Sequence, residues 1–169
     1  MAEKHPFGDF VPSGAKYLIL GSFVGKVEDG YNWFYGNRRN QFWAILMEVY
    51  KFDLSSKEKQ QKFLSGMCIA MADVILECER EGGSNLDTKL KNLVFNFSGV
   101  REILENNEIE KIYFSSRFVE NIYRRKFKSL LEEFEDIELL TLPSPSPRYA
   151  AIRREEKIKR YRQLMPKLP

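Results

Sequence analysis

The sequence has very few residues of the two kinds that most often bind metals in proteins. Its 169 residues include one histidine, His5, and two cysteines, Cys68 and Cys78. One histidine, in an N-terminal segment that we expect to be mobile, argues against histidine-based zinc sites and against Ser–His–Asp triads. Two cysteines cannot supply the four thiolates of an iron–sulfur cluster within one chain. These counts argue against such metal centres.

Long apolar segments are also missing. No stretch of about 18 apolar residues occurs, and the opening MAEKHPFGDF lacks the apolar core of a secretory signal. These absences predict a cytoplasmic protein without a membrane partner, in which both thiols are reduced and buried as small hydrophobic groups. No internal repeat or linker divides the chain. We expect a single domain over residues 1–169, in monomeric form.

The composition is otherwise that of an ordinary globular protein, with 43% hydrophobic and 30% charged residues. The aromatic share, 14%, is high, and such rings can form either a core or exposed stacking platforms. The net charge of +3 permits a polyanionic partner without requiring one.

Short apolar runs alternate with helical patterns along the chain. The runs that indicate buried strands are residues 16–22, 68–75, 111–116 and 137–143. These runs are continuous, which is typical of a sheet covered on both faces. The helical patterns fall at residues 40–52, 55–67 with Ser55 or Ser56 as cap, 98–109, 117–135 and 148–165. The expected fold class is therefore α/β, a three-layer αβα sandwich with a central four-stranded parallel sheet.

Polar and conformationally special residues follow the ends of the predicted strands, where open α/β sheets bind their ligands. The segments after the four strands are, in order, GSFVG, DVILECEREGGSNLD, SSRF and LPSPSPRYA. Between the first strand and the first helix lies FYGNRRNQFWAIL, residues 34–46, which mixes aromatic rings, arginines and asparagines. We expect the functional site at this edge of the sheet.

Two of these segments together resemble a known family. LILGSFVG, followed ten residues later by YGNRRNQFW, resembles the first motif of the uracil-DNA glycosylase superfamily, and most of all that of its hypoxanthine-DNA (deoxyinosine) glycosylase branch. LPSPSPRYA resembles the superfamily's second motif, a proline–serine loop that leads into the closing helix. CIAMADVILECEREGGSNLD resembles the second strand and following loop of that branch. The resemblance covers roughly residues 15–165, in the order that the family requires.

The resemblance implies a DNA glycosylase that flips a deaminated base, hypoxanthine or uracil, out of DNA and hydrolyses its glycosidic bond, with damaged DNA as its partner. It also implies an enzyme that needs neither a metal nor an organic cofactor. By the same resemblance Asn40 is the expected catalytic residue, whose amide can hold the base or a water. The residues expected to bind the base are Ser22, Phe23, Tyr35, Asp73 and Asn96. The residues expected to bind DNA are Ser144, Ser146, Arg148 and Tyr149.

The proline–serine loop and the closing helix also carry groups suited to phosphate. Alternating prolines remove three backbone donors, and the amides and hydroxyls of Ser144 and Ser146 remain as donors. Arg148 or Tyr149 would then fill the gap left by the flipped base. The basic residues of the closing helix could track neighbouring phosphates; they are Arg153, Arg154, Lys157, Lys159, Arg160 and Arg162.

Several of these side chains have structural alternatives. Asn40 could cap the following helix and still face the cleft. Tyr35 could stack on a base or belong to the core. Asp73 could be a general base or bond backbone amides at a strand end, and we prefer the second. Asn96 could touch the base or only shape a turn, and we favour the turn. The basic closing helix could be no more than a solvated face.

Three positions depart from the family pattern. Phe23 stands where the better-known uracil branches carry an Asp or Asn that handles the water, and Leu142 stands where their second motif often begins with His or Asn. Arg38 replaces a proline that is usual in the hypoxanthine branch. Phe23 and Leu142 suggest one alternative, a catalytically inactive nucleic-acid-binding protein of the same fold. A small nucleotide-binding protein with GSFVG on a phosphate is another, although the full glycine fingerprint is missing.

Overall fold

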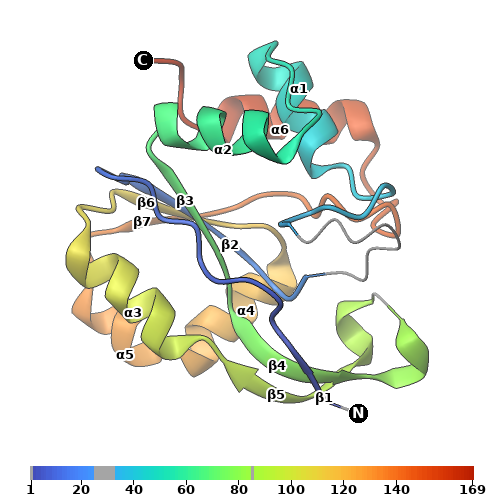
Figure 1. The fold of residues 1–169 in the computed structure, drawn as a ribbon, viewed down its shortest axis with the longest axis vertical. Helices are drawn as coiled ribbons and strands as arrows, with labels where there is room; N and C mark the ends of the chain where they lie inside the picture. The colour runs from blue at the N-terminus through green and yellow to red at the C-terminus, as the bar shows by residue number, and fades with distance from the viewer. Residues whose placement is uncertain (1, 25–32, 85) are drawn as a thin grey trace.

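A four-stranded parallel sheet forms the centre of the molecule in the computed structural model, which describes residues 2–24, 33–84 and 86–169 (Figure 1). Its strands are β2 (Tyr17–Gly21), β3 (Ile69–Asp73), β6 (Lys111–Phe114) and β7 (Glu138–Thr141), in the order β3-β2-β6-β7. Leu20 of β2 lies opposite Ala72 of β3 on one side and Phe114 of β6 on the other. The predicted class and sheet are confirmed, with each strand shorter than its apolar run.

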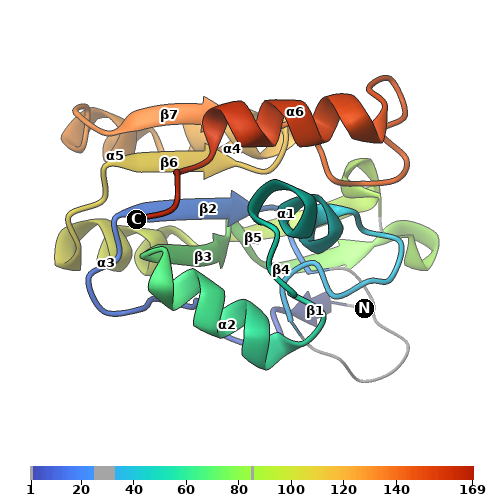
Figure 2. The same ribbon diagram turned by 90° about the horizontal axis from the view of Figure 1, so that it is seen from above.

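Both faces of this sheet are covered by helices, as the continuous apolar runs predicted (Figure 2). Ile19 of β2 packs with the residues of one face, and Leu18 and Leu20 pack with those of the other. Helices α1 (Phe42–Tyr50), α2 (Lys57–Gly66) and α6 (Arg154–Leu164) cover the Ile19 face. Helices α3 (Phe97–Asn106), α4 (Arg117–Lys126) and α5 (Lys128–Glu133) cover the opposite face. The side chains therefore alternate between two hydrophobic layers, as they must in a strand.

Two of the expected helices differ from their predicted extents. The helix expected over residues 117–135 is interrupted at Phe127, whose backbone leaves the helical region (φ −114°, ψ 27°) while its ring is fully buried. The closing helix begins at Arg154 rather than at Arg148. The preceding residues instead form a turn, in which Arg148 and Tyr149 donate their backbone N–H groups to Ser146.

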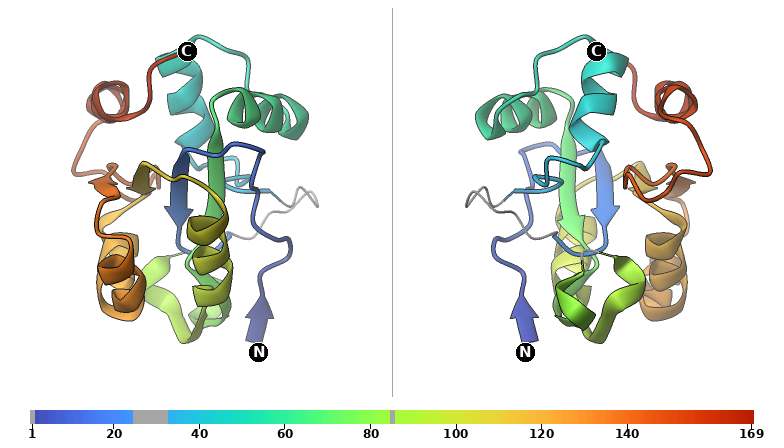
Figure 3. Two further views of the ribbon diagram at one scale, coloured as in Figure 1. Left: turned by 90° about the vertical axis from the view of Figure 1, so that its left-hand side faces the viewer. Right: turned by 90° about the vertical axis from the view of Figure 1, so that its right-hand side faces the viewer.

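A second, antiparallel sheet was not predicted. It consists of β1 (Ala2–Lys4), β4 (Ile75–Arg80) and β5 (Leu90–Phe95), in the order β1-β4-β5. Between β4 and β5 lie two short 3₁₀ turns, at Glu81–Gly83 and Asp87–Lys89. Only Val74 separates β3 from β4, so the small sheet lies beyond the carboxyl ends of the large sheet's strands (Figure 3). The charged residues of β4 made this segment resemble a loop in the sequence.

The N-terminal segment is ordered against the sheets, so the expectation of a mobile N-terminus is wrong for the residues described. The His5 backbone N–H donates to the Leu76 carbonyl at 2.7 Å. Phe10 and Met71 exchange two backbone hydrogen bonds, of 2.9 and 2.8 Å. Phe7 packs its ring edge-on against Phe34, with 4.8 Å between the ring centres. These contacts hold the segment along the outer edge of β3 and β4, which protects that edge from pairing with another chain.

Two further expectations concern the cysteines and membranes. Cys78 is buried as expected, but Cys68 is only half-buried and has a left-handed backbone conformation (φ 59°). Both are free thiols.

In the part of the chain that the structure describes, no helix combines the length and the apolar character that crossing a membrane requires.

The start of α2 allows a direct test of the local structure. Ser56 is the N-cap of α2, and its hydroxyl accepts the Lys59 N–H at 3.2 Å. Because Ser56→Ala removes this acceptor, we expect it to lower the free energy of unfolding by about 1 kcal/mol. The matched control is Ser55→Ala, at the exposed residue before the cap, which should cost less than about 0.5 kcal/mol. Urea denaturation measures both, and equal losses would contradict the assignment of the cap.

Candidate active site

A cleft of about 1180 Å³ opens at the carboxyl ends of the parallel strands. Its walls come from segments that are far apart in the sequence: residues 22–24, 34–40, 86–88, 115–118 and 141–149, together with Asp73, Ile152 and Arg160. Asn40 and Ser144, from the first and last of the candidate motifs, line this same cleft. The structure therefore brings the two motifs together at the edge of the sheet where the sequence predicted a site.

The two motif loops are joined directly. The Gln41 backbone N–H donates to the Pro145 carbonyl at 2.9 Å. The Lys157 ammonium group donates to the Gln41 side-chain oxygen at 3.1 Å and to the Ser146 carbonyl at 3.2 Å. Lys157 is only 1% exposed, and burial lowers its pKa. The expectation that Lys157 tracks DNA phosphates is therefore wrong, because this side chain is enclosed and holds the two loops in place.

Asn40 lies directly before the N-cap of α1, which is Gln41, so the expectation that Asn40 itself is the cap is wrong. Its side-chain oxygen accepts the Phe42 N–H at 2.9 Å in a turn at the start of the helix, and the residue also lines the cleft. The Asn40 backbone N–H donates to the Asn37 carbonyl at 2.9 Å, which closes the turn before the helix. Since the oxygen is directed at the helix, the NH₂ group is the end of the amide that can serve a ligand. Among the described residues, none bonds that NH₂ group.

Tyr35 belongs partly to the core and partly to the cleft. Its ring stacks on that of Phe42, with 4.1 Å between centres and 11° between planes, and its backbone is left-handed (φ 55°). Its hydroxyl is buried and has no hydrogen-bond partner within the described residues. Burial raises the pKa of this hydroxyl, and the charge of Asp73 raises it further, while nearby Ser115 opposes the shift. Burying a hydroxyl without a hydrogen-bond partner costs free energy, so the Tyr35 hydroxyl is a candidate group for binding a ligand in the cleft.

Gly21, at the end of β2, lets two polar groups approach the backbone closely. A Cβ atom at this position would lie 2.5 Å from Asp73 Oδ1 and 2.7 Å from the Tyr35 hydroxyl oxygen. Both distances are far below van der Waals contact. Only glycine therefore allows the carboxylate and the hydroxyl to meet above the end of β2, where both residues line the cleft.

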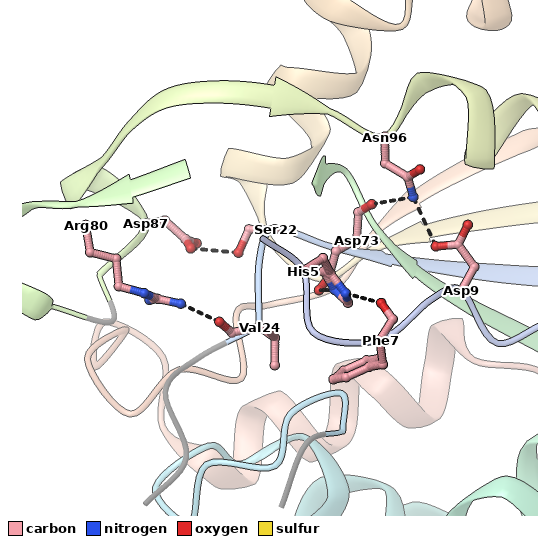
Figure 4. Close-up of polar contacts among 9 residues, drawn as sticks. All are labelled: His5, Phe7, Asp9, Ser22, Val24, Asp73, Arg80, Asp87 and Asn96. Atoms are coloured by element: carbon pink, nitrogen blue, oxygen red, sulfur yellow. Dashed lines mark hydrogen bonds and ion pairs between the residues drawn. The ribbon is translucent and has the colours of Figure 1, made fainter. Parts of the chain in front are cut away.

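Asp73 is held by His5 (Figure 4). The His5 Nε2 atom lies 2.7 Å from Asp73 Oδ2, and the two side chains are 7% and 6% exposed. His5 Nδ1 donates to the Phe7 carbonyl, which can only accept. Burial lowers the pKa of His5, but the hydrogen bond and the charge of Asp73 outweigh it and raise the pKa above 6.5. Among the described residues, the Asp73 carboxylate thus bonds a side chain and none of the backbone amides that the sequence favoured.

Asn96 lies behind Asp73 and is not among the residues that line the cleft. Its amide NH₂ donates to Asp9 Oδ1 and to the Asp73 backbone carbonyl, both at 3.0 Å. Asn96 is 4% exposed and stands directly before α3. The expectation that it binds the base is therefore not supported by its position, and the favoured alternative, shaping the chain, describes it.

Ser22 and Phe23 directly follow β2. Asp87, which the sequence analysis did not single out, contacts Ser22 (Figure 4). The Ser22 hydroxyl donates to Asp87 Oδ1 at 2.7 Å. Burial raises the pKa of Asp87, the bond from Ser22 opposes this, and the charge of Asp73 adds to it. The Phe23 ring meets the His5 ring edge-on, with 5.6 Å between centres. Gly25 and Asn85, in the same motifs, lie outside the described residues.

The proline–serine loop uses some of the donors that were expected to bind phosphate. The Ser146 backbone N–H donates to the Ser144 hydroxyl oxygen at 3.2 Å, so this amide is occupied. The hydroxyl hydrogens and the exposed Arg148 and Tyr149 side chains remain at the rim. Arginines outnumber acidic residues along the cleft; they are Arg38, Arg39, Arg117, Arg148 and Arg160, against Asp73 and Asp87. This charge favours a polyanion.

No group of three or more histidine, cysteine, aspartate or glutamate side chains suited to a metal ion occurs among the residues described.

Sequence reasoning missed two polar residues near the cleft, His5 and Asp87. His5 had one usable signal, its place in the aromatic-rich run HPFGDF, which is typical of a packed segment. Asp87 had none, since its contact with Ser22 spans 65 positions of sequence.

The fold and the cleft define a class of protein: a three-layer α/β domain in which the loop that carries Asn40 and the proline–serine loop line one cleft, together with several arginines.

No family model matches the chain. A hypoxanthine DNA glycosylase of Methanosarcina barkeri (strain Fusaro / DSM 804) is 33% identical to this chain over 107 residues. The matched segment is 62% of this chain and 66% of the relative, so the chain spans just under two thirds of the relative's length. The solution NMR structure of a candidate uracil DNA glycosylase from Methanosarcina acetivorans matches with a TM-score of 0.71 and 27% identity, covering 98% of this chain and 100% of that one. By these two likenesses the chain resembles the uracil-DNA glycosylase superfamily and, within it, the hypoxanthine-DNA glycosylase branch.

The His5–Asp73 pair makes stability depend on pH. Because the pKa of His5 is raised above 6.5 in the fold, its stabilising contribution is fully present below that pH and is lost as pH rises through the folded pKa. We therefore expect the difference in unfolding free energy between the native protein and His5→Gln to shrink as pH rises. Urea denaturation across this window measures it, with Lys4→Gln, at an exposed neighbour, as control. A difference that is constant with pH would contradict the pairing.

Proposed function

We propose that the protein is a monofunctional DNA glycosylase of base-excision repair, which excises hypoxanthine or uracil from DNA by base flipping and hydrolysis. The observation that carries this proposal is the single cleft in which Asn40 faces the proline–serine loop, with the two segments joined by the bond from Gln41 to Pro145. The names of the two similar proteins support the substrate class. No metal or organic cofactor takes part in the proposed reaction.

Asn40 acts in this proposal through its NH₂ group. Its oxygen is engaged by the Phe42 N–H, so the amide is fixed in one orientation. A fixed donor can stabilise the negative charge that develops on a departing base, or hold the oxygen of the attacking water. Since the donor is in place before the reaction, little reorganisation is needed as the charge develops.

Asp73 and Tyr35 provide a means to recognise a deaminated base. Hypoxanthine and uracil each present a ring N–H beside a carbonyl, whereas adenine and cytosine present a ring acceptor beside an amino donor. Asp73 Oδ1 can accept from the ring N–H, and the Tyr35 hydroxyl can donate to the carbonyl, because both lie against Gly21. His5 keeps the carboxylate in one orientation through Oδ2. A parental base would leave these buried groups unpaired, which is costly.

Contacts to the DNA backbone come from the rim of the cleft. The positively charged arginines there bind the flanking phosphates, and the hydroxyls of Ser144 and Ser146 donate hydrogen bonds to phosphate oxygens. Arg148 and the exposed Tyr149 follow the loop, where either can fill the gap left by the flipped nucleotide. None of the described residues that line the cleft is a lysine, so the proposed product is an abasic site made without a Schiff base.

A substrate panel with two Asn40 variants tests the proposal. Duplexes that carry one hypoxanthine, uracil or xanthine are incubated with the protein, and hot alkali then converts any abasic site into a strand break. We expect breaks at hypoxanthine or uracil. Asn40→Asp keeps an acceptor for the Phe42 N–H but removes the NH₂ donor, so the rate should fall by about 10²- to 10³-fold with the fold intact. Asn40→Ala also loses the acceptor for the Phe42 N–H and should be less stable, by about 1 kcal/mol.

The same panel decides between this proposal and its alternative. Tight, salt-sensitive binding to the duplexes without any strand break would identify a nucleic-acid-binding protein that has lost the chemistry, as Phe23 in the first loop suggests. Strand breaks that persist unchanged in Asn40→Asp would contradict the role of its amide. Equal rates for hypoxanthine and adenine would contradict the proposed recognition by Asp73 and Tyr35.

A further inference from the structure

The proposed reaction needs a group that takes a proton from water, and Asn40 cannot be that group. A neutral amide is not a useful base near neutral pH, and the Asn40 oxygen already accepts a hydrogen bond. Phe23 occupies the first-loop position at which a carboxylate could have stood. Within the described lining of the cleft, the carboxylates are Asp73 and Asp87. Asp73 is paired with His5 through Oδ2, and its Oδ1 is assigned above to recognition of the base, so Asp87 is the carboxylate that remains for this task.

Asp87 lies at the right place for this task. It belongs to the turn Asp87–Lys89, between β4 and β5, and its Oδ1 accepts the Ser22 hydroxyl at 2.7 Å. Ser22 directly follows β2 and directly precedes Phe23. A carboxylate from a distant segment therefore contacts Ser22, the residue before Phe23, and lines the cleft (Figure 4).

The surroundings of Asp87 suit a base. Burial raises its pKa, the Ser22 bond lowers it, the negative charge of Asp73 at the end of β3 raises it, and the charge of Arg80 in β4 lowers it. The net direction is upward. A carboxylate with a raised pKa takes a proton more readily than a solvated aspartate, and this is the direction that general-base catalysis requires.

We propose that Asp87 is the general base that activates the hydrolytic water; this inference rests on the glycosylase function proposed above. The Asp87 carboxylate takes one proton from the water as the water oxygen bonds to C1′ of the flipped nucleotide. The bond from C1′ to the base nitrogen breaks, and its electron pair leaves on the base, whose charge the Asn40 NH₂ group stabilises. The base anion then takes up a proton, and Asp87 returns its proton to the solvent. The net change is the addition of one water across the glycosidic bond.

Asp87→Asn separates this role from a structural one. Asparagine has the same shape and keeps an oxygen that can accept the Ser22 hydroxyl, but it cannot take a proton. We expect kcat to fall by about 10²- to 10⁴-fold with KM little changed. The acidic limb of the kcat–pH profile, which reports protonation of the base, should also disappear. The control is Asp9→Asn, because burial also raises the pKa of Asp9 but its carboxylate lies outside the cleft lining; this variant should keep the limb.

The outcomes distinguish the two proposals. If the native protein breaks no duplex, the proposed function fails. If it is active and Asp87→Asn retains both its kcat and its acidic limb, the proposed function stands and this inference is overturned. Thermal unfolding of each variant shows whether it folds. If Asp87→Asn does not, Asp87→Glu and Asp87→Gln take its place: the carboxylate variant should retain more activity than the amide variant, and equal activities would overturn the inference.

Discussion

The hydrogen bond from the Gln41 N–H to the Pro145 carbonyl is the contact on which the arrangement of the site depends. It joins two loops that are about a hundred residues apart in the sequence, and the Lys157 ammonium group donates a hydrogen bond to each of them. A buried ammonium group is tolerated only when acceptors surround it, and here those acceptors come one from each loop. Backbone and buried side-chain contacts thus hold the two walls of the cleft together. In the proposed function, walls that are already joined reduce the ordering cost of binding a flipped nucleotide.

The inner end of the cleft depends on a second constraint, the close approach above Gly21. Asp73, Tyr35 and Ser22 meet there from three segments, and the N-terminal residues reach the same place from the outer edge of β3. His5 fixes Asp73, and Asp87 is fixed by Ser22. Among the described residues, Asp73 is paired with a histidine, whereas Asp87 accepts the Ser22 hydroxyl. The two proposed roles, base recognition by Asp73 and proton transfer by Asp87, rest on this difference in partners.

Much of the fold could be predicted because local signals and the final packing agree. Ile19 and its neighbours are apolar at every position, which is what a strand between two helical layers requires. Asn40 was recognisable as a cleft residue because it follows the end of a predicted strand, in a segment that resembles the family's first motif. The small sheet was missed because β4 places Glu77 and Glu79, residues of poor strand propensity, in a strand; there Glu77 pairs with Lys4, and Glu79 accepts a hydrogen bond from Asn92. Lys157, His5 and Asp87 were misjudged or missed because their roles arise from contacts across 65 positions or more.

The most direct test of the central claim, that both loops and the strand ends surround one flipped base, is an NMR titration. The isotope-labelled protein is titrated with a duplex that carries 2′-fluorodeoxyinosine, whose fluorine slows cleavage by destabilising positive charge at C1′. The account predicts that the largest amide shift changes fall together in residues 33–40, in residues 141–149 and at Ser22 and Asp73. Changes concentrated instead on α3 and α5, on the opposite face of the sheet, would contradict it.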